Sequence, residues 1–167
     1  MVIRLSNLLE YTLYSGKESE VDLSEELKQI TGYIDLEKLR FGNRLKITTE
    51  ISEDIYGLLI APLLLLPFVE NSFKHGASND LKSSFINLSV DVKNNKLLFC
   101  LSNSYRSESG KFESYKERIG LKNVKRRLEL LYPNKYTLEI IQKQDIFEVK
   151  LIMELKESGP NNSISAV

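Results

Sequence analysis

Residues 58–76 have the sequence LLIAPLLLLPFVENSFKHG, in which a dense apolar run passes without a break into a polar ending. Residues three and four positions apart share one face of a helix. A helix over residues 68–74 therefore directs Val69 and Phe73 toward a core. The opposite face then carries Asn71, Lys74 and His75. The sequence predicts an amphipathic helix whose polar side combines an amide, an ammonium and an imidazole.

This polar set suits a complex of magnesium with a polyphosphate. Magnesium takes hard oxygen ligands and keeps several waters, and the amide of Asn71 offers one such oxygen. The ammonium of Lys74 is a point charge for phosphate. Spacing alone nevertheless favours an ordinary amphipathic helix with a solvated polar face, because short polar sets are common by chance.

Composition restricts the class of protein. The 167 residues are 42% hydrophobic and 28% charged, with a net charge of zero, which is typical of one soluble globular domain. The sequence has no excess of basic residues, so it does not indicate a nucleic-acid partner. With Cys100 as the single cysteine and His75 as the single histidine, a Cys/His zinc site is excluded. Cys100 is expected to be a buried thiol in a reducing compartment.

Membrane insertion of the given chain is not expected. No signal peptide is visible at its start. Its longest apolar run, residues 58–69, is shorter than the roughly 20 residues that a bilayer-spanning helix needs. We therefore expect the chain as given to be soluble.

The first half of the chain alternates helices and strands. Residues 1–16 have a helical apolar pattern, and residues 21–23 form a short strand candidate. Ser24 is the predicted cap of a helix that starts at Glu25 and ends at Gly42. The apolar stripe of this helix consists of Leu23, Leu27, Ile30 and Ile34. A strand over residues 45–51 follows. The next helix is predicted to begin at Pro62, and Pro67 either kinks it or begins a new helix.

The second half is richer in strands. Residues 86–92 and 96–102 form one predicted hairpin, and residues 136–140 and 147–155 form another. The long polar stretch 104–119 between them is expected to be a functional loop or lid. A helix opened by Gly120 precedes the second hairpin. Its predicted core-facing residues are Leu121, Val124, Leu128 and Leu131, and Pro133 stops it. Antiparallel strands beside segregated helices predict an α+β two-layer sandwich.

Three motifs resemble sensor histidine kinases of the branch typified by LytS and YehU. PLLLLPFVENSFKHG resembles their N box, RLSNLLEYTLYS at residues 4–15 resembles the second helix of their dimerisation domain, and RIGLKNV with RRLELLYP resembles their second glycine box. The resemblance implies the fold shared by gyrase, Hsp90, histidine kinases and MutL, a mixed, mostly antiparallel sheet with helices on one face. It also implies three regions: the end of a dimerisation helix with its linker (1–20), an ATP-binding catalytic domain (21–156) and a disordered tail (157–167).

The resemblance gives roles to the N box residues. Asn71 matches the asparagine that coordinates the magnesium bridging the ATP phosphates. Glu70 matches an acidic residue that orients water or polarises the attacking group, although a solvated carboxylate is an alternative. Lys74 and His75 match donors to phosphate or ribose oxygens, and Glu70, Asn71 and Lys74 are the catalytic candidates. The family's acceptor histidine precedes the region that matches residues 1–16, so His75 is not the phosphoacceptor.

Two further clusters complete the expected nucleotide site. In LSNS, residues 101–104, Asn103 stands where the family has an aspartate that binds the adenine amino group, and the family's following glycines are missing. Its carbonyl oxygen can accept that bond, but a plain strand-end asparagine is equally consistent with the sequence. The segment at residues 118–124 resembles a lid that closes onto a helix N-terminus, which favours phosphate. Its nucleotide-binding candidates are Gly120, Leu121 and Asn123, and Arg118 replaces the first glycine of the box.

The implied function is that of the cytoplasmic ATP-binding domain of a two-component sensor histidine kinase, with ATP and Mg²⁺ as cofactors. The full-length protein is expected to be a membrane-anchored homodimer. It would transfer the γ-phosphoryl group to a histidine on its own dimerisation domain, and then to a response regulator of the LytTR type. Two alternatives remain: a docking module of the same fold that has lost nucleotide binding, and a serine kinase acting as an anti-sigma factor.

Overall fold

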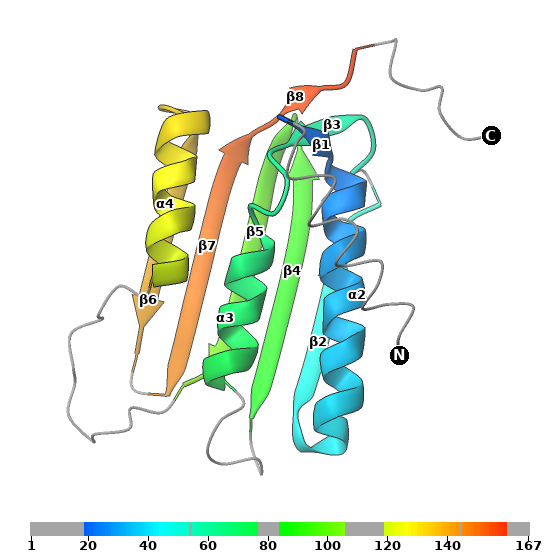
Figure 1. Cartoon of the computed structure of the whole chain (residues 1–167), viewed down its shortest axis with the longest axis vertical. Coiled ribbons are helices and arrows are strands. Elements are labelled where there is room, and N and C mark those ends of the chain that lie inside the picture. Colours follow the sequence, from blue (N-terminus) through cyan, green and yellow to red (C-terminus); the bar gives the residue numbers. More distant parts are fainter. Residues whose placement is uncertain (1–18, 54, 77–83, 106–118, 144, 160–167) are drawn as a thin grey trace.

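The computed structural model describes residues 19–53, 55–76, 84–105, 119–143 and 145–159. Within these ranges, three helices cover one face of a five-stranded sheet (Figure 1). The helices are α2 (Leu23–Phe41), α3 (Leu66–Gly76) and α4 (Ile119–Leu131), and a 3-10 turn, η2 (Gly42–Arg44), follows α2. The predicted two-layer α+β fold is confirmed.

The large sheet is mixed and mostly antiparallel, as predicted. Its strands lie in the order β2-β4-β5-β7-β6, and only the β2–β4 pair is parallel among those described. The strands are β2 (Lys46–Ile51), β4 (Phe85–Lys93), β5 (Lys96–Ser104), β6 (Tyr136–Gln142) and β7 (Ile146–Glu154). A small antiparallel sheet at one end joins β1 (Val21–Asp22), β3 (Leu58–Ile60) and β8 (Lys156–Glu157) in the order β1-β3-β8.

Helix α2 follows its predicted apolar stripe, and all four stripe residues are buried. The predicted cap is wrong, however. The N-cap is Asp22, whose carboxylate accepts a hydrogen bond from the backbone nitrogen of Ser24 at 2.9 Å. The helix ends at Gly42 as predicted, where φ is 55° and the N–H donates to the carbonyl of Lys38. A residue without a side chain adopts this left-handed backbone without strain.

The segment before α3 differs from its prediction. No helix begins at Pro62. Residues 58–60 instead form strand β3, which lies between β1 and β8. An irregular segment at residues 61–65 follows, and α3 starts at Leu66 with Pro67 as its second residue. Proline is favoured in the first helical turn, where its missing N–H has no partner to lose. Of the two options for Pro67, the one that begins a new helix is confirmed.

The core lies between the helices and the large sheet. Phe68 of α3 packs on Phe99 of β5, with ring centroids 5.9 Å apart. Side chains alternate between the two faces of a strand, so Leu97, Phe99 and Leu101 are buried under the helices. Cys100 points to the other face and is only half-buried. The expectation of a buried thiol is therefore wrong, although partial burial still raises its pKa.

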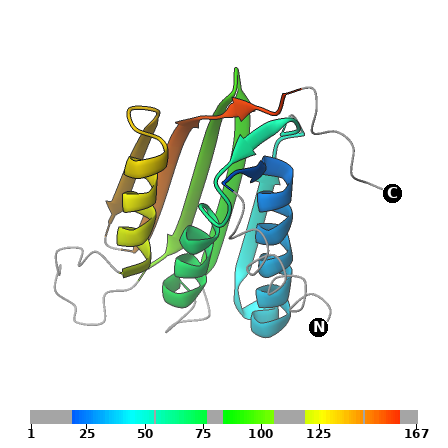
Figure 2. The same cartoon turned by 45° about the horizontal axis from the view of Figure 1, so that its top comes forward.

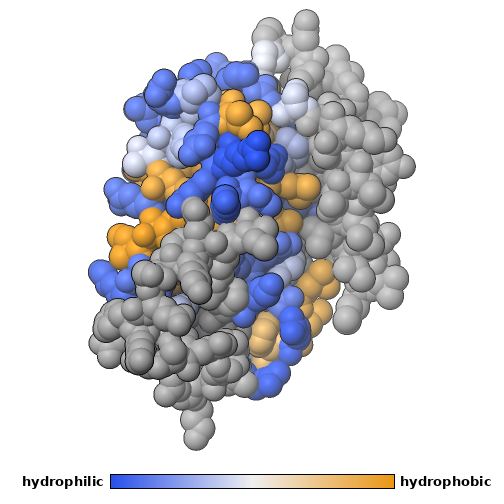
Figure 3. Space-filling view, turned by 60° about the vertical axis from the view of Figure 1, so that its left-hand side comes forward, coloured by the Kyte–Doolittle hydropathy of each residue, from blue (hydrophilic) through white to orange (hydrophobic). Residues whose placement is uncertain are grey.

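Helix α4 buries Leu121, Val124 and Leu128, as predicted, but Leu131 is 52% exposed. Tyr132, four positions after Leu128, occupies the core position instead and is 6% exposed. Leu130 is also exposed at this end of α4. Figure 3 brings forward the side of the molecule that carries α4 and β6, and it shows apolar patches within a mainly hydrophilic surface.

Several predicted features lie at or beyond the limits of the described residues. The region matched to a dimerisation helix, most of the predicted lid and residues 160–167 fall outside them. Glu157, assigned to a tail from the sequence, pairs with Leu58 in the small sheet. The helices of the described part include none that is long and apolar enough to cross a membrane.

Candidate functional site

Four element ends meet at one edge of the molecule. Figures 1 and 2 both place the C-terminal end of α3 and the N-terminal end of α4 at the lower edge, where β5 ends and β7 begins. Ser104 at the end of β5 pairs with Ile146 at the start of β7. The three predicted clusters sit on these ends: the N box on α3, Asn103 on β5 and the second glycine box on α4. The structure therefore brings the elements of all three clusters to one edge.

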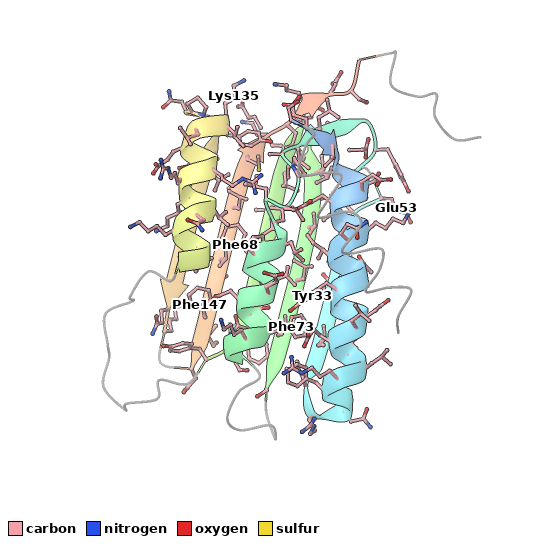
Figure 4. All side chains as sticks on the ribbon, in the orientation of Figure 1. Tyr33, Glu53, Phe68, Phe73, Lys135 and Phe147 are labelled. Carbon is pink, nitrogen blue, oxygen red and sulfur yellow. The ribbon has the colours of Figure 1, made fainter. Side chains whose placement is uncertain are left out.

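Aromatic packing orients the C-terminal half of α3. Phe73 is buried and makes an edge-to-face contact with Tyr33 of α2, with ring centroids 5.7 Å apart (Figure 4). It also stacks on Phe41 at 6.2 Å. With Phe73 held in the core, Asn71 is half-buried and Lys74 is exposed. The predicted split of α3 into a core face and a polar face is confirmed, and the side chain of His75 lies outside the described part.

Glu70 of α3 and Tyr33 of α2 both have raised pKa values. Desolvation raises the pKa of the Glu70 carboxyl group, and the Lys74 ammonium partly offsets this effect. The pKa of Tyr33 is also raised, first by burial and then by the carboxylates of Glu37 and Glu70. Tyr33 is therefore neutral at physiological pH. Glu70 holds a proton more readily than a free carboxyl group does, which suits it to proton transfer or to polarising a bound hydroxyl.

Asn103 presents an unpartnered acceptor under the helices. It lies on the core face of β5, opposite Ile86 and Phe147 in the neighbouring strands, and is 1% exposed. Its Nδ2 donates to the carbonyl of Ser104 at 2.7 Å. Its Oδ1 is buried and has no hydrogen-bond partner among the described residues. Buried polar atoms are nearly always paired in proteins, so this oxygen is available to an incoming donor.

The N-terminus of α4 contributes backbone groups. The first amides of a helix have no partner within the helix, and they attract anions. Gly120 and Asn123 are exposed, whereas Leu121 is buried and anchors this end in the core. Arg118 lies outside the described residues. This helix end, with Lys74 across the edge, favours a negatively charged group.

The residues fit a magnesium ion only if the ligand supplies most of its coordination. Within the described ranges, no group of three or more His, Cys, Asp or Glu residues could hold a metal. Asn71 offers one neutral amide oxygen. Magnesium bound through one or two protein oxygens, phosphate oxygens and waters matches such a sparse site.

Sequence reasoning did not find three side chains that hold the segment directly before α3. Glu26 of α2 accepts hydrogen bonds from two backbone N–H groups of the segment at residues 61–65, while Arg127 and Tyr132 bind the same segment from the α4 side. One signal was present: Glu26 falls within the apolar stripe of α2, three positions after Leu23 and four before Ile30. A carboxylate in such a stripe indicates a buried partner.

Comparisons with known proteins agree with this architecture. A family model described as Histidine kinase matches residues 1–45. Sensor histidine kinase YpdA of Escherichia coli K12 is 30% identical over 139 residues, which cover 79% of this chain and 24% of YpdA. Sensor protein LytS of Staphylococcus epidermidis is 32% identical over 97 residues, which cover 58% of this chain and 16% of LytS. The chain thus spans about a quarter or less of the length of these two relatives.

Solved structures share the fold at low sequence identity. The histidine kinase domain of the blue-light-activated kinase EL346 from Erythrobacter litoralis superimposes with a TM-score of 0.61 at 15% identity, covering 92% of this chain and 72% of that one. Full-length ShkA in complex with AMPPNP gives a TM-score of 0.57 at 14% identity, covering 93% of this chain and 36% of that one.

The fold is that of a histidine kinase catalytic domain. Within that class, the sequence matches show that the chain is a relative of the LytS-type sensor histidine kinases. The resemblance inferred from the N box is thereby confirmed.

Proposed function

We propose that this chain is the ATP-binding catalytic part of a two-component sensor histidine kinase. It would transfer the γ-phosphoryl group of ATP to a histidine on a separate dimerisation domain. The observation that carries this proposal is the unpartnered, buried Oδ1 of Asn103, which stands one residue before the end of β5. This end of β5 lies at the same edge of the molecule as the end of α3 and the start of α4 (Figure 1). The adenine amino group is a donor that would satisfy this oxygen.

The remaining proposed roles belong to residues of α3 and α4 at the same edge of the molecule. Asn71 would supply an amide oxygen to Mg²⁺, which neutralises phosphate charge when it is bound. Lys74, His75, the backbone amides of Gly120 and Leu121, and the side chain of Asn123 would hold phosphate oxygens. Glu70, whose pKa is raised, would accept a hydrogen bond from the attacking group. Phosphoryl transfer needs mainly positioning and charge stabilisation, which these groups provide.

The acceptor histidine would belong to the dimerisation domain of the parent protein. We propose that residues 1–20 are the end of a dimerisation helix with its linker and that the catalytic domain begins at residue 21. The match to the histidine kinase family model covers residues 1–45 and so includes both parts. We propose a homodimeric, membrane-anchored parent protein whose kinase domain is cytoplasmic, with a response regulator of the LytTR type as the final acceptor. No role in nucleic-acid binding is proposed.

Calorimetric titration of the chain with Mg·ATP tests the binding step. The wild-type chain and an Asn87→Ala control, altered at an exposed position on β4, should release heat. Asn71→Ala should release none at the same concentrations, because the metal loses the amide oxygen that Asn71 supplies. Absence of heat with the wild-type chain at millimolar ATP would favour a docking module instead.

Transfer is tested by mixing the chain with the separate dimerisation domain of its parent protein and labelled ATP. Acid-labile phosphate should appear on that domain and not on this chain, because its single histidine serves the nucleotide. The chain is also labelled alone. If it then carries phosphate, and if His75→Gln loses this label while it still binds nucleotide, the acceptor is His75 and the proposal is contradicted.

A further inference from the structure

The irregular segment at residues 61–65 connects β3 to α3 and is held by side chains. The carboxylate of Glu26 uses both of its oxygens: Oε2 accepts from the N–H of Leu63 at 2.8 Å, and Oε1 accepts from the N–H of Leu65 at 3.0 Å. These contacts join α2 to the residues directly before the first turn of α3.

Helix α4 holds the same segment from the other side. Arg127 donates through Nη2 to the carbonyl of Pro62 at 2.7 Å and through Nη1 to the carbonyl of Leu63 at 2.8 Å. A planar guanidinium is suited to two such parallel bonds. The segment is thus fixed through its N–H groups to α2 and through its carbonyl groups to α4.

Both sets of bonds converge on a strained residue. Leu63 has φ of 55°, in the left-handed region that non-glycine residues rarely adopt. Its N–H is held by Glu26 and its carbonyl by Arg127. Such conformations persist only where the surroundings over-determine them, and they concentrate near functional sites.

Glu26 stands at a core position where an apolar side chain is the usual choice. Glu26 is 0% exposed, and its neighbours on the helix face, Leu23, Leu27 and Ile30, are apolar and buried. Buried charged groups often contribute less to stability than apolar residues of similar volume would. The geometry that the carboxylate imposes on residues 63 and 65 therefore explains Glu26 better than core packing does.

We propose that Glu26 and Arg127 are positioning residues of the nucleotide site. By fixing the segment at residues 61–65 between α2 and α4, they set the direction in which α3 leaves it. They thereby set where Asn71 lies relative to Asn103 and to the N-terminus of α4. This inference rests on the proposed function, because it assigns the two residues to the phosphate and metal end of the ATP site.

Glu26→Gln in the 167-residue chain is the first test. Glutamine offers one oxygen and turns an NH₂ group toward the second backbone N–H, so one bond is lost and α3 shifts. The Kd for Mg·ATP should rise about 10-fold, the range seen when a residue that orients a metal ligand is changed. The Kd for ADP in EDTA, which does not involve the metal contact of Asn71, should rise much less. Glu25→Gln, exposed on the same helix, is the matched control and should change neither.

Arg127→Lys, with Arg126→Lys as its exposed control, is a milder second test. Lysine can bind only one of the two carbonyls, so the same selective loss of Mg·ATP affinity is expected. The Glu26→Gln, Arg127→Lys double variant should lose less binding free energy for Mg·ATP than the sum of the losses in the two single variants, because both residues act through one segment. Partial unfolding would weaken the affinities for Mg·ATP and for ADP by the same factor, and that result would overturn the proposal. Unchanged affinities in folded variants would overturn it as well.

Amide chemical shifts separate this proposal from the proposed function. If the wild-type chain bound no nucleotide, the proposed function would fail, but positioning would still be visible in the ligand-free protein. Glu26→Gln should then shift the side-chain amide of Asn71 and the backbone amides of α3, and Glu25→Gln should not. Shift changes that stop at Leu65 would show that Glu26 fixes the segment without orienting α3.

Discussion

The hydroxyl oxygen of Tyr132 lies 2.7 Å from the backbone nitrogen of Ala61 and accepts its hydrogen bond inside the core. The two residues are 71 positions apart in the chain. Through this bond, the residue that follows α4 satisfies an N–H group at the point where β3 ends and the segment leading to α3 begins. The tyrosine ring also fills the core position at this end of α4.

Tyr132→Phe should destabilise the protein, because it keeps the ring and leaves the buried N–H of Ala61 without a partner. Leaving such a donor unsatisfied costs about 1–3 kcal/mol. Urea unfolding followed by circular dichroism measures this cost. Tyr136→Phe, a half-buried tyrosine on β6, serves as the control. A loss equal to that of the control would show that water replaces the tyrosine hydroxyl.

Stability should fall in alkaline solution. Burial raises the pKa of Tyr132 above its ordinary value of 10.0 and that of Cys100 above 9.0. It also raises the pKa of Tyr33. A group whose pKa is higher in the folded state stabilises the protein below its unfolded pKa. This contribution is lost as pH rises through the folded pKa. Unfolding free energy should therefore decline from about pH 9 upward, and the decline should be shallower in Tyr132→Phe. A flat profile between pH 8 and pH 11 would contradict the assignment.

Asn103→Leu should separate stability from function. The change removes a buried acceptor that has no partner among the described residues, a defect that costs about 1–3 kcal/mol. It also removes the bond to the Ser104 carbonyl, which contributes about 0.5–1.5 kcal/mol. The melting temperature should thus stay level or rise, while binding of adenine nucleotides is lost. A clear drop in melting temperature would mean that the amide serves the fold.

Glu70→Gln should stabilise the ligand-free protein at neutral pH. Desolvation raises the pKa of this carboxyl group above its ordinary value of 4.5. Its stabilising contribution is therefore present below that value and is lost as the pH rises through the folded pKa. The variant should unfold at higher urea concentration than the wild type at pH 7 and at the same concentration near pH 4, while phosphoryl transfer falls. Equal midpoints at pH 7 would show that the ionised carboxylate is fully solvated.

Local patterns predicted most of the secondary structure. The stripe of α2 with its end at Gly42 and the alternation in β4 and β7 depend on neighbouring residues, so they are visible in the sequence. Strand β3 was missed because Leu58 and Leu59 pair with residues 157 and 156, far later in the chain. Without these partners, LLIAPLLLL has the composition of a buried helix. Similarly, Tyr132 replaces Leu131 in the core through contacts that periodicity does not contain.

The candidate site divides in the same way. The N box indicated the polar face of α3, and Asn103 was found because it stands where the family it resembles has an aspartate. The lack of a partner for the Asn103 oxygen and the desolvation that raises the pKa of Glu70 depend on neighbours in the folded chain, which composition does not give. Glu26 was overlooked because its partners are backbone groups 37 and 39 residues away.

The small sheet has a consequence for synthesis of the protein on the ribosome. Strand β3 is enclosed by β1, which is made before it, and by β8, which follows the whole large sheet. Until residues 156–157 emerge, one edge of β3 lacks its hydrogen-bonded partner and can pair with another nascent chain. Strand β8 therefore covers the open edge of β3 only when synthesis of the domain is nearly complete. Chains interrupted shortly before it should be prone to aggregate, even though every helix of the described domain has already been made.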